Sequence, residues 1–232
     1  MKKLKTYKGY NIIEIVLIIL GLVSVLVSSL IFKSDWIIIL HTVLCLLTVF
    51  TQAKAKLITQ ILGILAFSLY AFIAYKNSLF GEVIIYATVV IPFYIYGIVN
   101  WFKNKDKQNE VVLIKTNISK KEWLIMIVFL SIISVGIYFL LKFLNTEQLI
   151  VSTLSFVTMI PSIYLLARRS KWNQICFLIN DLFLMFMWLI LIVQGNYQLI
   201  TILVCFVYQT IYDIYGIIEW GRLEKLQKGK KE

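Results

Sequence analysis

The sequence predicts an all-α integral membrane protein with eight transmembrane helices. Of its 232 residues, 60% are hydrophobic and only 15% are charged, whereas soluble domains carry about 25% charged residues. The apolar segments run on for about twenty residues, the length that a helix needs to cross a hydrocarbon core of about 30 Å. Strands of a membrane barrel are about half as long and alternate in polarity, so a barrel is not expected.

Eight apolar runs satisfy this length criterion. The first carries Glu14, is too long for the apolar region of a signal peptide and is followed by no small-residue cleavage site, so we expect it to be retained. The second is the shortest and could extend into the loop at Gln52–Lys56. The predicted spans are Ile12–Phe32, Trp36–Thr51, Leu57–Tyr75, Val83–Phe102, Trp123–Leu141, Leu149–Ala167, Gln174–Val193 and Leu199–Trp220.

The basic residues support this number of spans and predict their orientation. Alternate loops face the same side, and 20 of the 23 Lys and Arg residues fall on the side that holds both termini. The other side holds only Lys33, Lys76 and Lys142. Because basic loops stay in the cytoplasm, we predict a multi-pass protein of the plasma membrane with both termini cytoplasmic. The net charge of +11 is then an orientation signal and a contact with anionic lipid of the bilayer, and no nucleic-acid partner is expected.

The sequence offers little material for catalysis. Its three Cys residues lie in different spans without a C-x-x-C pair, and His41 is the only histidine. We expect His41 to make a polar contact between helices. Phosphate-binding loops, zinc-protease motifs and nucleophile elbows are all absent from the sequence. We therefore predict no enzyme activity, no catalytic residue, no metal site and no cofactor.

The fourth and eighth spans end alike, which indicates an internal repeat. Ile95–Trp101 reads Ile-Tyr-Gly-Ile-Val-Asn-Trp, and Ile214–Trp220 reads Ile-Tyr-Gly-Ile-Ile-Glu-Trp, 119 residues later. The same spacing brings the second to fourth spans onto the sixth to eighth. Spans four apart run in the same direction, so the halves are parallel repeats, which in transporters enclose the substrate site at their interface.

Two residue pairs within this repeat have expected roles of their own. Gly97 and Gly216 are expected to let helices approach closely. Trp101 and Trp220 are expected to lie in the aromatic belt at the membrane surface.

The prediction is therefore a single membrane domain, residues 1–232, built as a 3+1+3 arrangement with one added helix. Its parts are an extra N-terminal helix (12–32), a first three-helix repeat (36–102), a linker helix (123–141), a second three-helix repeat (149–220) and a cytoplasmic tail (221–232).

Short motifs between Leu46 and Trp220 follow a distinctive order. They are Ala53-Lys54-Ala55-Lys56, Gly63, Tyr70-Ala71-x-x-Ala74, Gly81-Glu82, Ile91-Pro92, Gly97-x-x-x-Trp101, Ala167-Arg168-Arg169, Trp172, Asn180-Asp181 and Gly216-x-x-x-Trp220. In this order and in its 3+1+3 arrangement, the chain resembles the PnuC family of nicotinamide riboside transporters.

The resemblance implies uptake of a vitamin precursor of nucleoside type by facilitated diffusion, with the substrate trapped by intracellular phosphorylation. It also implies a helix count like that of the sugar-transporting SWEET proteins and a homo-oligomer, expected to be a trimer. Carriers of thiamine, riboflavin or deoxynucleosides are related alternatives. A second alternative is a membrane substrate-binding subunit of a larger transport complex.

Polar residues inside the spans mark the expected substrate site, because such residues normally face a bundle interior or a cavity. In the seventh span, Gln174, Asp181 and Trp188 recur every seven residues on one helix face. A flat base stacks on aromatic rings, and ribose hydroxyls pair with amides and carboxylates. The expected substrate-binding residues are Trp172, Asn180, Asp181, Trp188, Gln209, Asp213, Gln60, Tyr86 and Tyr94.

The roles within this set differ. Trp188 is assigned to base stacking with Trp172 as a second candidate, Asn180 and Asp181 to the ribose or base edge, and Gln209 and Asp213 to the opposite wall. Trp172 could instead be a belt residue, and the amides could only join helices. Asp181 could instead be a proton-coupling acid.

One position departs from the family pattern. The resemblance implies a W-x-x-x-N motif in the seventh span, and Asn180 supplies its asparagine. Cys176 stands at the tryptophan position, which puts recognition of the nicotinamide ring in doubt.

Overall fold

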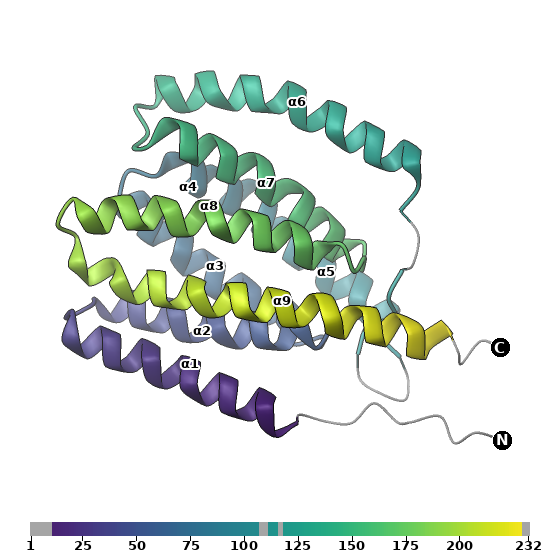
Figure 1. The fold of residues 1–232 in the computed structure, drawn as a ribbon. Coiled ribbons are helices and arrows are strands. Elements are labelled where there is room, and N and C mark those ends of the chain that lie inside the picture. The colour runs from purple at the N-terminus through teal and green to yellow at the C-terminus, as the bar shows by residue number, and fades with distance from the viewer. Residues whose placement is uncertain (1–10, 107–110, 116–117, 229–232) are drawn as a thin grey trace.

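Each of the eight predicted spans is helical in the computed structural model, which describes residues 11–106, 111–115 and 118–228 (Figure 1). Seven are continuous α-helices, and the fourth is built from three consecutive segments. The elements are α1 (Ile12–Ile31), α2 (Trp36–Ala53), α3 (Thr59–Lys76), α4 (Phe80–Ile85), the π-helix η1 (Tyr86–Val90), α5 (Ile91–Lys103), α6 (Lys120–Phe143), α7 (Leu149–Ala167), α8 (Asn173–Val193), the 3₁₀ turn η2 (Tyr197–Leu199) and α9 (Ile200–Lys228). The prediction of an all-helical membrane protein is confirmed.

Local sequence signals explain where several helices begin and bend. Asn11 caps α1 by accepting from the Glu14 backbone N–H, and the Glu14 carboxylate accepts from the Asn11 N–H, both at 2.9 Å. Ser119 caps α6 in the same way through the N–H of Glu122. Pro92, the second residue of α5, has no N–H to donate, and the wider π turn of Tyr86–Val90 ends two residues before it.

The helices α9 and α6 are both longer than predicted. Apolar sequence ends at Trp220, yet α9 continues to Lys228, so most of the predicted tail is helical. The Gln227 amide fixes this extension by donating to the Val112 carbonyl at 3.0 Å and accepting from the Ile114 N–H at 2.8 Å. Hydropathy could not reveal this extension, because it depends on a distant loop.

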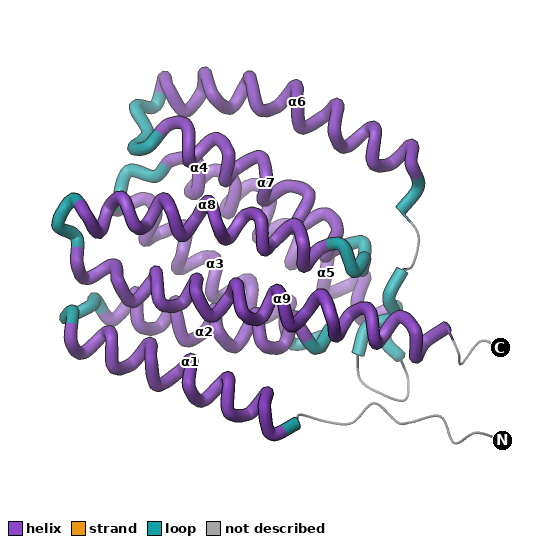
Figure 2. Tube along the Cα trace, in the orientation of Figure 1, coloured by secondary structure: helices purple, strands orange, loops and turns teal. Residues whose placement is uncertain are grey.

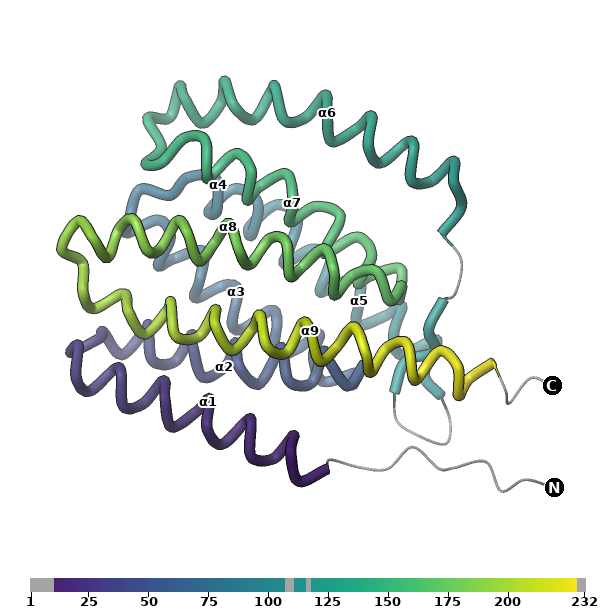
Figure 3. Tube along the Cα trace, viewed as in Figure 1, coloured from purple at the N-terminus to yellow at the C-terminus, as the bar shows by residue number. Residues whose placement is uncertain are grey.

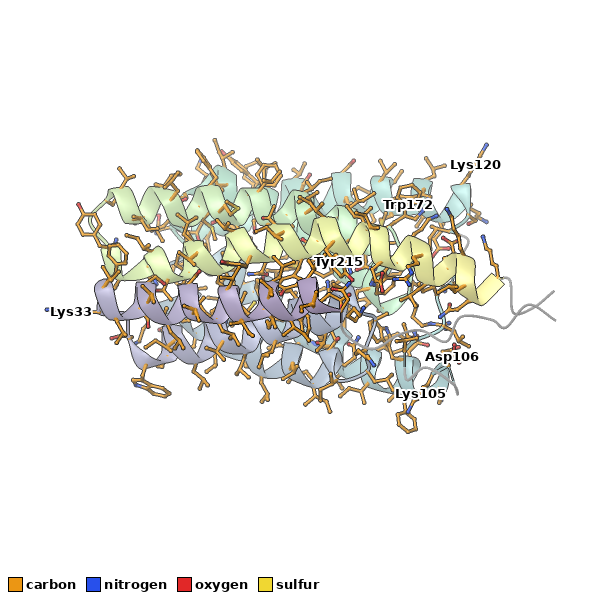
Figure 4. All side chains as sticks on the ribbon, turned by 60° about the horizontal axis from the view of Figure 1, so that its bottom comes forward. Lys33, Lys105, Asp106, Lys120, Trp172 and Tyr215 are labelled. Atoms are coloured by element: carbon orange, nitrogen blue, oxygen red, sulfur yellow. The ribbon has the colours of Figure 1, made fainter. Side chains whose placement is uncertain are left out.

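The basic loops gather at one end of the bundle. Figure 4 shows Lys105 and Lys120 at that end and Lys33 at the other. Backbone bridges join Lys56 to Val111 and Lys105 to Val112. Predicted basic residues that lie outside the described residues are Lys2, Lys3, Lys5, Lys8, Lys107, Lys230 and Lys231.

Short turns join consecutive helices (Figure 2), and corresponding turns of the two predicted repeats share one backbone feature. Each contains a residue with positive φ two positions after the last residue of the helix, and the turn after α6 has a second such residue, Gln148 (55°). The residues two positions after a helix are Lys33 (50°) and Asn145 (51°) after α1 and α6, Ala55 (51°) and Arg169 (59°) after α2 and α7, and Ser78 (55°) and Gly195 (105°) after α3 and α8. The turns thus relate α1 to α6, and they also relate α2–α5 to α7–α9. This correspondence also fits a division into two sets of four spans, α1–α5 and α6–α9. The 3+1+3 division stays a prediction.

Trp101 and Trp220 lie where the two halves meet, and the prediction of membrane-belt residues is wrong. Both indoles are fully buried, with ring centroids 6.0 Å apart. Trp101 donates its Nε1–H to the Leu166 carbonyl of α7 at 3.2 Å, and Trp220 donates to the Gln52 carbonyl of α2 at 2.9 Å. Trp101 therefore ties α5 to α7, and Trp220 ties α9 to α2. Figure 3 shows α9 alongside α2 despite their separation in sequence.

Candidate substrate site

The polar face predicted for the seventh span points into the bundle. Asn173, Gln174, Asn180, Asp181 and Trp188 on α8 are all at most 4% exposed. The opposite face of the helix is exposed or half-buried. The seven-residue spacing in the sequence thus identified the interior face correctly.

Asn180 belongs to a hydrogen-bonded link between three helices. Its amide donates to the Ser155 carbonyl at 2.9 Å and to the Thr158 hydroxyl at 3.0 Å, both on α7. The Ser155 hydroxyl donates to the Glu82 carboxylate of α4 at 2.5 Å. Glu82 and Asn180 are fully buried, and Glu82 Oε2 and Asn180 Oδ1 have no hydrogen-bond partner among the described residues. This link therefore presents two free acceptors inside the protein.

An aromatic cluster surrounds Tyr70 of α3. Trp188 donates its Nε1–H to the Tyr70 hydroxyl at 3.0 Å, which joins the two halves of the molecule. The Tyr70 ring lies 4.6 Å from Tyr86, 5.2 Å from His41 and 6.1 Å from Phe206 between centroids. Two of the predicted site residues, Trp188 and Tyr86, thus meet at a tyrosine that the prediction did not include.

Tyr94 continues this cluster towards α2. Its ring lies 5.4 Å from that of Phe67, which in turn lies 5.2 Å from Tyr86, and its hydroxyl donates to Gln52 Oε1 at 3.3 Å. His41 contributes from the same helix: its Nδ1 lies 2.9 Å from the Ala66 carbonyl of α3. That contact confirms the predicted polar link between helices.

A second polar group joins α8 to α9. Asp181 of α8 and Asp213 of α9 are both buried, with 4% and 2% of their surface exposed. In the amide orientation that satisfies its neighbours, Gln174 donates to Asp213 Oδ1 at 3.1 Å and accepts from Trp220 Nε1 at 3.1 Å. Asp213 Oδ2 has no hydrogen-bond partner in the described part of the chain.

The two repeat glycines each make room for a glutamine amide. A Cβ at Gly97 would lie 2.1 Å from Gln60 Oε1, and one at Gly216 would lie 2.7 Å from Gln174 Cδ. The predicted close approach at these glycines is therefore present. Gln60 Nε2 is buried and without a hydrogen-bond partner among residues 11–106, 111–115 and 118–228.

Two predicted residues lie apart from these groups. Trp172 is 42% exposed and lines a hollow of 680 Å³ at the basic end, together with Lys120, Lys171 and Glu224 (Figure 4). Gln209 is buried, but its amide faces the Cys205 sulfur at 3.8 Å on its own helix. Cys176, at the position of the family tryptophan, is only half-buried.

Glu82 and Tyr70 are the interior residues that the site prediction left out. Glu82 falls one residue before the predicted start of the fourth span, so it was not counted as an intramembrane acid. Tyr70 belongs to the Tyr70-Ala71-x-x-Ala74 motif of the third span, and its contact with Trp188 brings it to the predicted site residues. The described residues contain no group of three or more His, Cys, Asp or Glu side chains suited to a metal ion.

Eight membrane-length helices around a buried set of carboxyl, amide and aromatic side chains define a small multi-pass membrane protein with a polar interior. A family model described as "Nicotinamide mononucleotide transporter" matches residues 35–222, from just before α2 into α9. The chain belongs to this family, and the predicted resemblance to the PnuC transporters is confirmed.

Two similar proteins agree with this assignment. Over 240 aligned residues the chain is 24% identical to the nicotinamide riboside transporter PnuC of Neisseria mucosa, covering 98% of this chain and 88% of that protein. A crystal structure of the vitamin B3 transporter PnuC has the same fold, with a TM-score of 0.83 and 20% identity over 94% of each chain.

Proposed function

We propose that this protein takes up nicotinamide riboside, or a closely related nucleoside, by facilitated diffusion, and that phosphorylation inside the cell traps the substrate. The observation that carries the proposal is a set of three buried polar atoms without partners in the described chain: Glu82 Oε2, Asn180 Oδ1 and Asp213 Oδ2. Leaving such atoms unpaired costs about 1–3 kcal/mol each. A polar substrate between the helices would supply the missing partners.

The chemistry of nicotinamide riboside matches these groups. Its pyridinium ring is flat and positively charged, which suits the aromatic cluster at Tyr70 and Trp188 and the neighbouring acids Glu82 and Asp181. Its carboxamide and ribose hydroxyls suit Asn180 and the other amides. A mononucleotide would bring a phosphate towards these acids, and like charges in a buried site repel. The site therefore favours the riboside over the phosphorylated form.

Charge also divides the related substrates into two groups. Thiamine is a cation and would also suit buried carboxylates, whereas riboflavin and deoxynucleosides are neutral. Cys176 is half-buried and stands where the resemblance implies tryptophan. For this reason thiamine, riboflavin and deoxynucleosides are tested alongside nicotinamide riboside.

A thermal-shift screen of the purified protein tests substrate identity, because a ligand that binds the folded state raises the melting temperature by mass action. We expect nicotinamide riboside to give the largest shift and nicotinamide mononucleotide none at the same concentration. A larger shift with the mononucleotide, or with a neutral deoxynucleoside, would contradict the proposed recognition.

The orientation and assembly are part of the same proposal. We propose that both termini face the cytoplasm, since basic loops are retained there, and that three copies form the working unit. Two variants, Lys33→Cys and Lys115→Cys, each as the single cysteine of the chain, test the orientation in intact cells. A membrane-impermeant maleimide should label Lys33→Cys and not Lys115→Cys. Labelling of only the second would reverse the topology. Native mass spectrometry in detergent gives the number of chains.

A further inference from the structure

The helix α6 leaves an apolar groove along one flank of the protein. In Figure 1, α6 lies at one edge of the bundle and α1 at the opposite edge. The groove has a volume of 740 Å³ and is walled by α6, by α7, and by the segment from Ile84 to Phe93 that contains the π-helix. This volume falls within the range of about 300–1,000 Å³ that ligand-binding clefts typically have.

The helix on the other flank, α1, is in close contact with its neighbours. α1 packs against both α2 and α9, where Tyr208 fills the contact: its ring lies 3.2 Å from a Cβ built on Gly21, and its hydroxyl lies 3.0 Å from Ser24 Oγ. At the 119-residue spacing that aligns the two Tyr-Gly-x-x-x-Trp segments, Val89 corresponds to Tyr208. Val89 lines the groove. A small side chain thus stands where a tyrosine closes the equivalent contact.

The groove has an apolar length and one charged end. Along α6 its lining runs from Ser119 to Ile137, about 27 Å at the helical rise of 1.5 Å per residue. Phe129 and Ile133 line its middle, and Lys121 lies at the basic end of the bundle. One leaflet of the hydrocarbon core is about 15 Å thick, half of the full core. The apolar part is therefore long enough for a fatty acyl chain.

The charge at the open end is positive. Glu122 also lines this end, but Arg168 pairs with it at 2.8 Å and Tyr164 donates to it at 2.6 Å. Burial lowers the pKa of Arg168, but the hydrogen bond and charge of Glu122 outweigh this effect and leave that pKa above its ordinary value. With Glu122 neutralised, the exposed ammonium of Lys121 faces the mouth of the groove.

We propose that the groove holds one acyl chain of an anionic membrane phospholipid whose headgroup binds at Lys121. The walls supply apolar contact along the chain, and the lysine supplies the charge that distinguishes an anionic headgroup from a zwitterionic one. The lipid thereby takes the place that Tyr208 fills on the other flank.

Native mass spectrometry of the purified protein with phosphatidylglycerol, phosphatidylethanolamine or oleate tests this site. The wild-type chain should retain one phosphatidylglycerol per protomer through detergent exchange. Val89→Tyr rebuilds the tyrosine of the other flank and should lower the retained fraction at least fivefold. Val128→Tyr makes the same change on the exposed outer face of α6 and should leave the retained fraction unchanged. Equal retention by these two variants would overturn the proposal.

The headgroup and the identity of the occupant are tested separately. Lys121→Glu should abolish the preference for phosphatidylglycerol, whereas Lys120→Glu, which faces the hollow beside Trp172, should keep it. Ile133→Phe narrows the same groove from α6. If Val89→Tyr does not fold, Ile133→Phe replaces it and should lower the retained fraction of phosphatidylglycerol in the same way. Retention of oleate in preference to phosphatidylglycerol would overturn the headgroup assignment. A disulfide between protomers carrying Phe129→Cys would show a second copy in the groove instead of a lipid.

Discussion

Asn180 is the residue whose replacement tests recognition most directly. Its amide holds α7, while its buried Oδ1 is free for a ligand. We expect Asn180→Leu to weaken nicotinamide riboside binding tenfold or more, because hydrogen bonds to a charged ligand contribute roughly 1.5–3 kcal/mol. Isothermal titration gives the affinity. Asn196→Leu is a matched control, since Asn196 also donates to a backbone carbonyl but lies in the loop before η2.

Glu82 should carry the preference for a cation. The isosteric Glu82→Gln keeps an acceptor for Ser155 but removes the negative charge. We expect weaker binding of nicotinamide riboside and little change for a neutral nucleoside, measured by competition against the same labelled ligand. If both ligands lose affinity equally, Glu82 acts only by positioning Ser155 and Asn180.

Helical periodicity in the sequence predicts some of the interior residues but not all of them. Periodicity placed Asn180, Asp181 and Trp188 on the interior face of α8, because a helix repeats nearly every seven residues. It could not distinguish Trp101 or Trp220 from belt residues, since only the other half of the molecule buries them. Tyr70 gains its importance from Trp188, 118 residues away, and no local pattern reports that contact.

At the scale of helices, Lys54 fastens α1 to the rest of the bundle. Its buried ammonium lies 2.7 Å from Glu14 of α1 and 3.2 Å from Glu219 of α9. Lys54→Met would leave these two carboxylates without that cation, and breaking a buried ion pair costs about 3–5 kcal/mol. We expect a clearly lower melting temperature in detergent. Lys142→Met, at an exposed position on α6, should leave it unchanged.

A double replacement checks that the Lys54 effect is electrostatic. Glu14→Gln combined with Lys54→Met removes one of the two carboxylate charges that Lys54 faces and should recover part of the lost stability. A double variant less stable than Lys54→Met alone would show that Glu14 acts through its capping box with Asn11 instead.

The packing of α3 on α5 depends on Gly63. A Cβ at this position would lie 2.4–2.7 Å from three atoms of the Tyr94 ring, which is fully buried and cannot move aside freely. Gly63→Ala should therefore destabilise the protein by about 1–3 kcal/mol. Gly136→Ala on α6 meets nothing within 4 Å and should be neutral or stabilise by up to about 1 kcal/mol, since alanine favours helix. Both variants gain the same helix propensity of alanine over glycine. The difference between their melting temperatures therefore reports the steric clash at Gly63 alone.

The sequence could predict the helices themselves but not all of their geometry. Continuous apolar runs determined the number of spans, since a membrane tolerates only closed hydrogen bonding. The π-helix at Tyr86–Val90 and the gap beside α6 follow from how helices pack, and hydropathy contains no information about either.

In the whole molecule, the contact between the two predicted repeats, α2–α5 and α7–α9, carries the proposed site. Trp101 and Trp220 bind across this contact at the basic end, and Trp188 binds Tyr70 across it deeper in the bundle. A carrier of this kind must exchange these contacts to release substrate to either side, and a ligand biases such an exchange only through unequal affinity for the two states.

Facilitated diffusion makes a quantitative prediction for the whole molecule. With no energy source, the substrate inside proteoliposomes can only reach the outside concentration. We expect uptake of radiolabelled nicotinamide riboside to level at that value, without ATP or an imposed proton or sodium gradient. Enclosing a kinase that phosphorylates the riboside, with ATP, should raise total label well above this level, because the phosphate excludes the product from the acidic site. Accumulation driven by a proton gradient alone would instead assign Asp181 to proton coupling, and no entry without added proteins would favour a subunit of a larger complex.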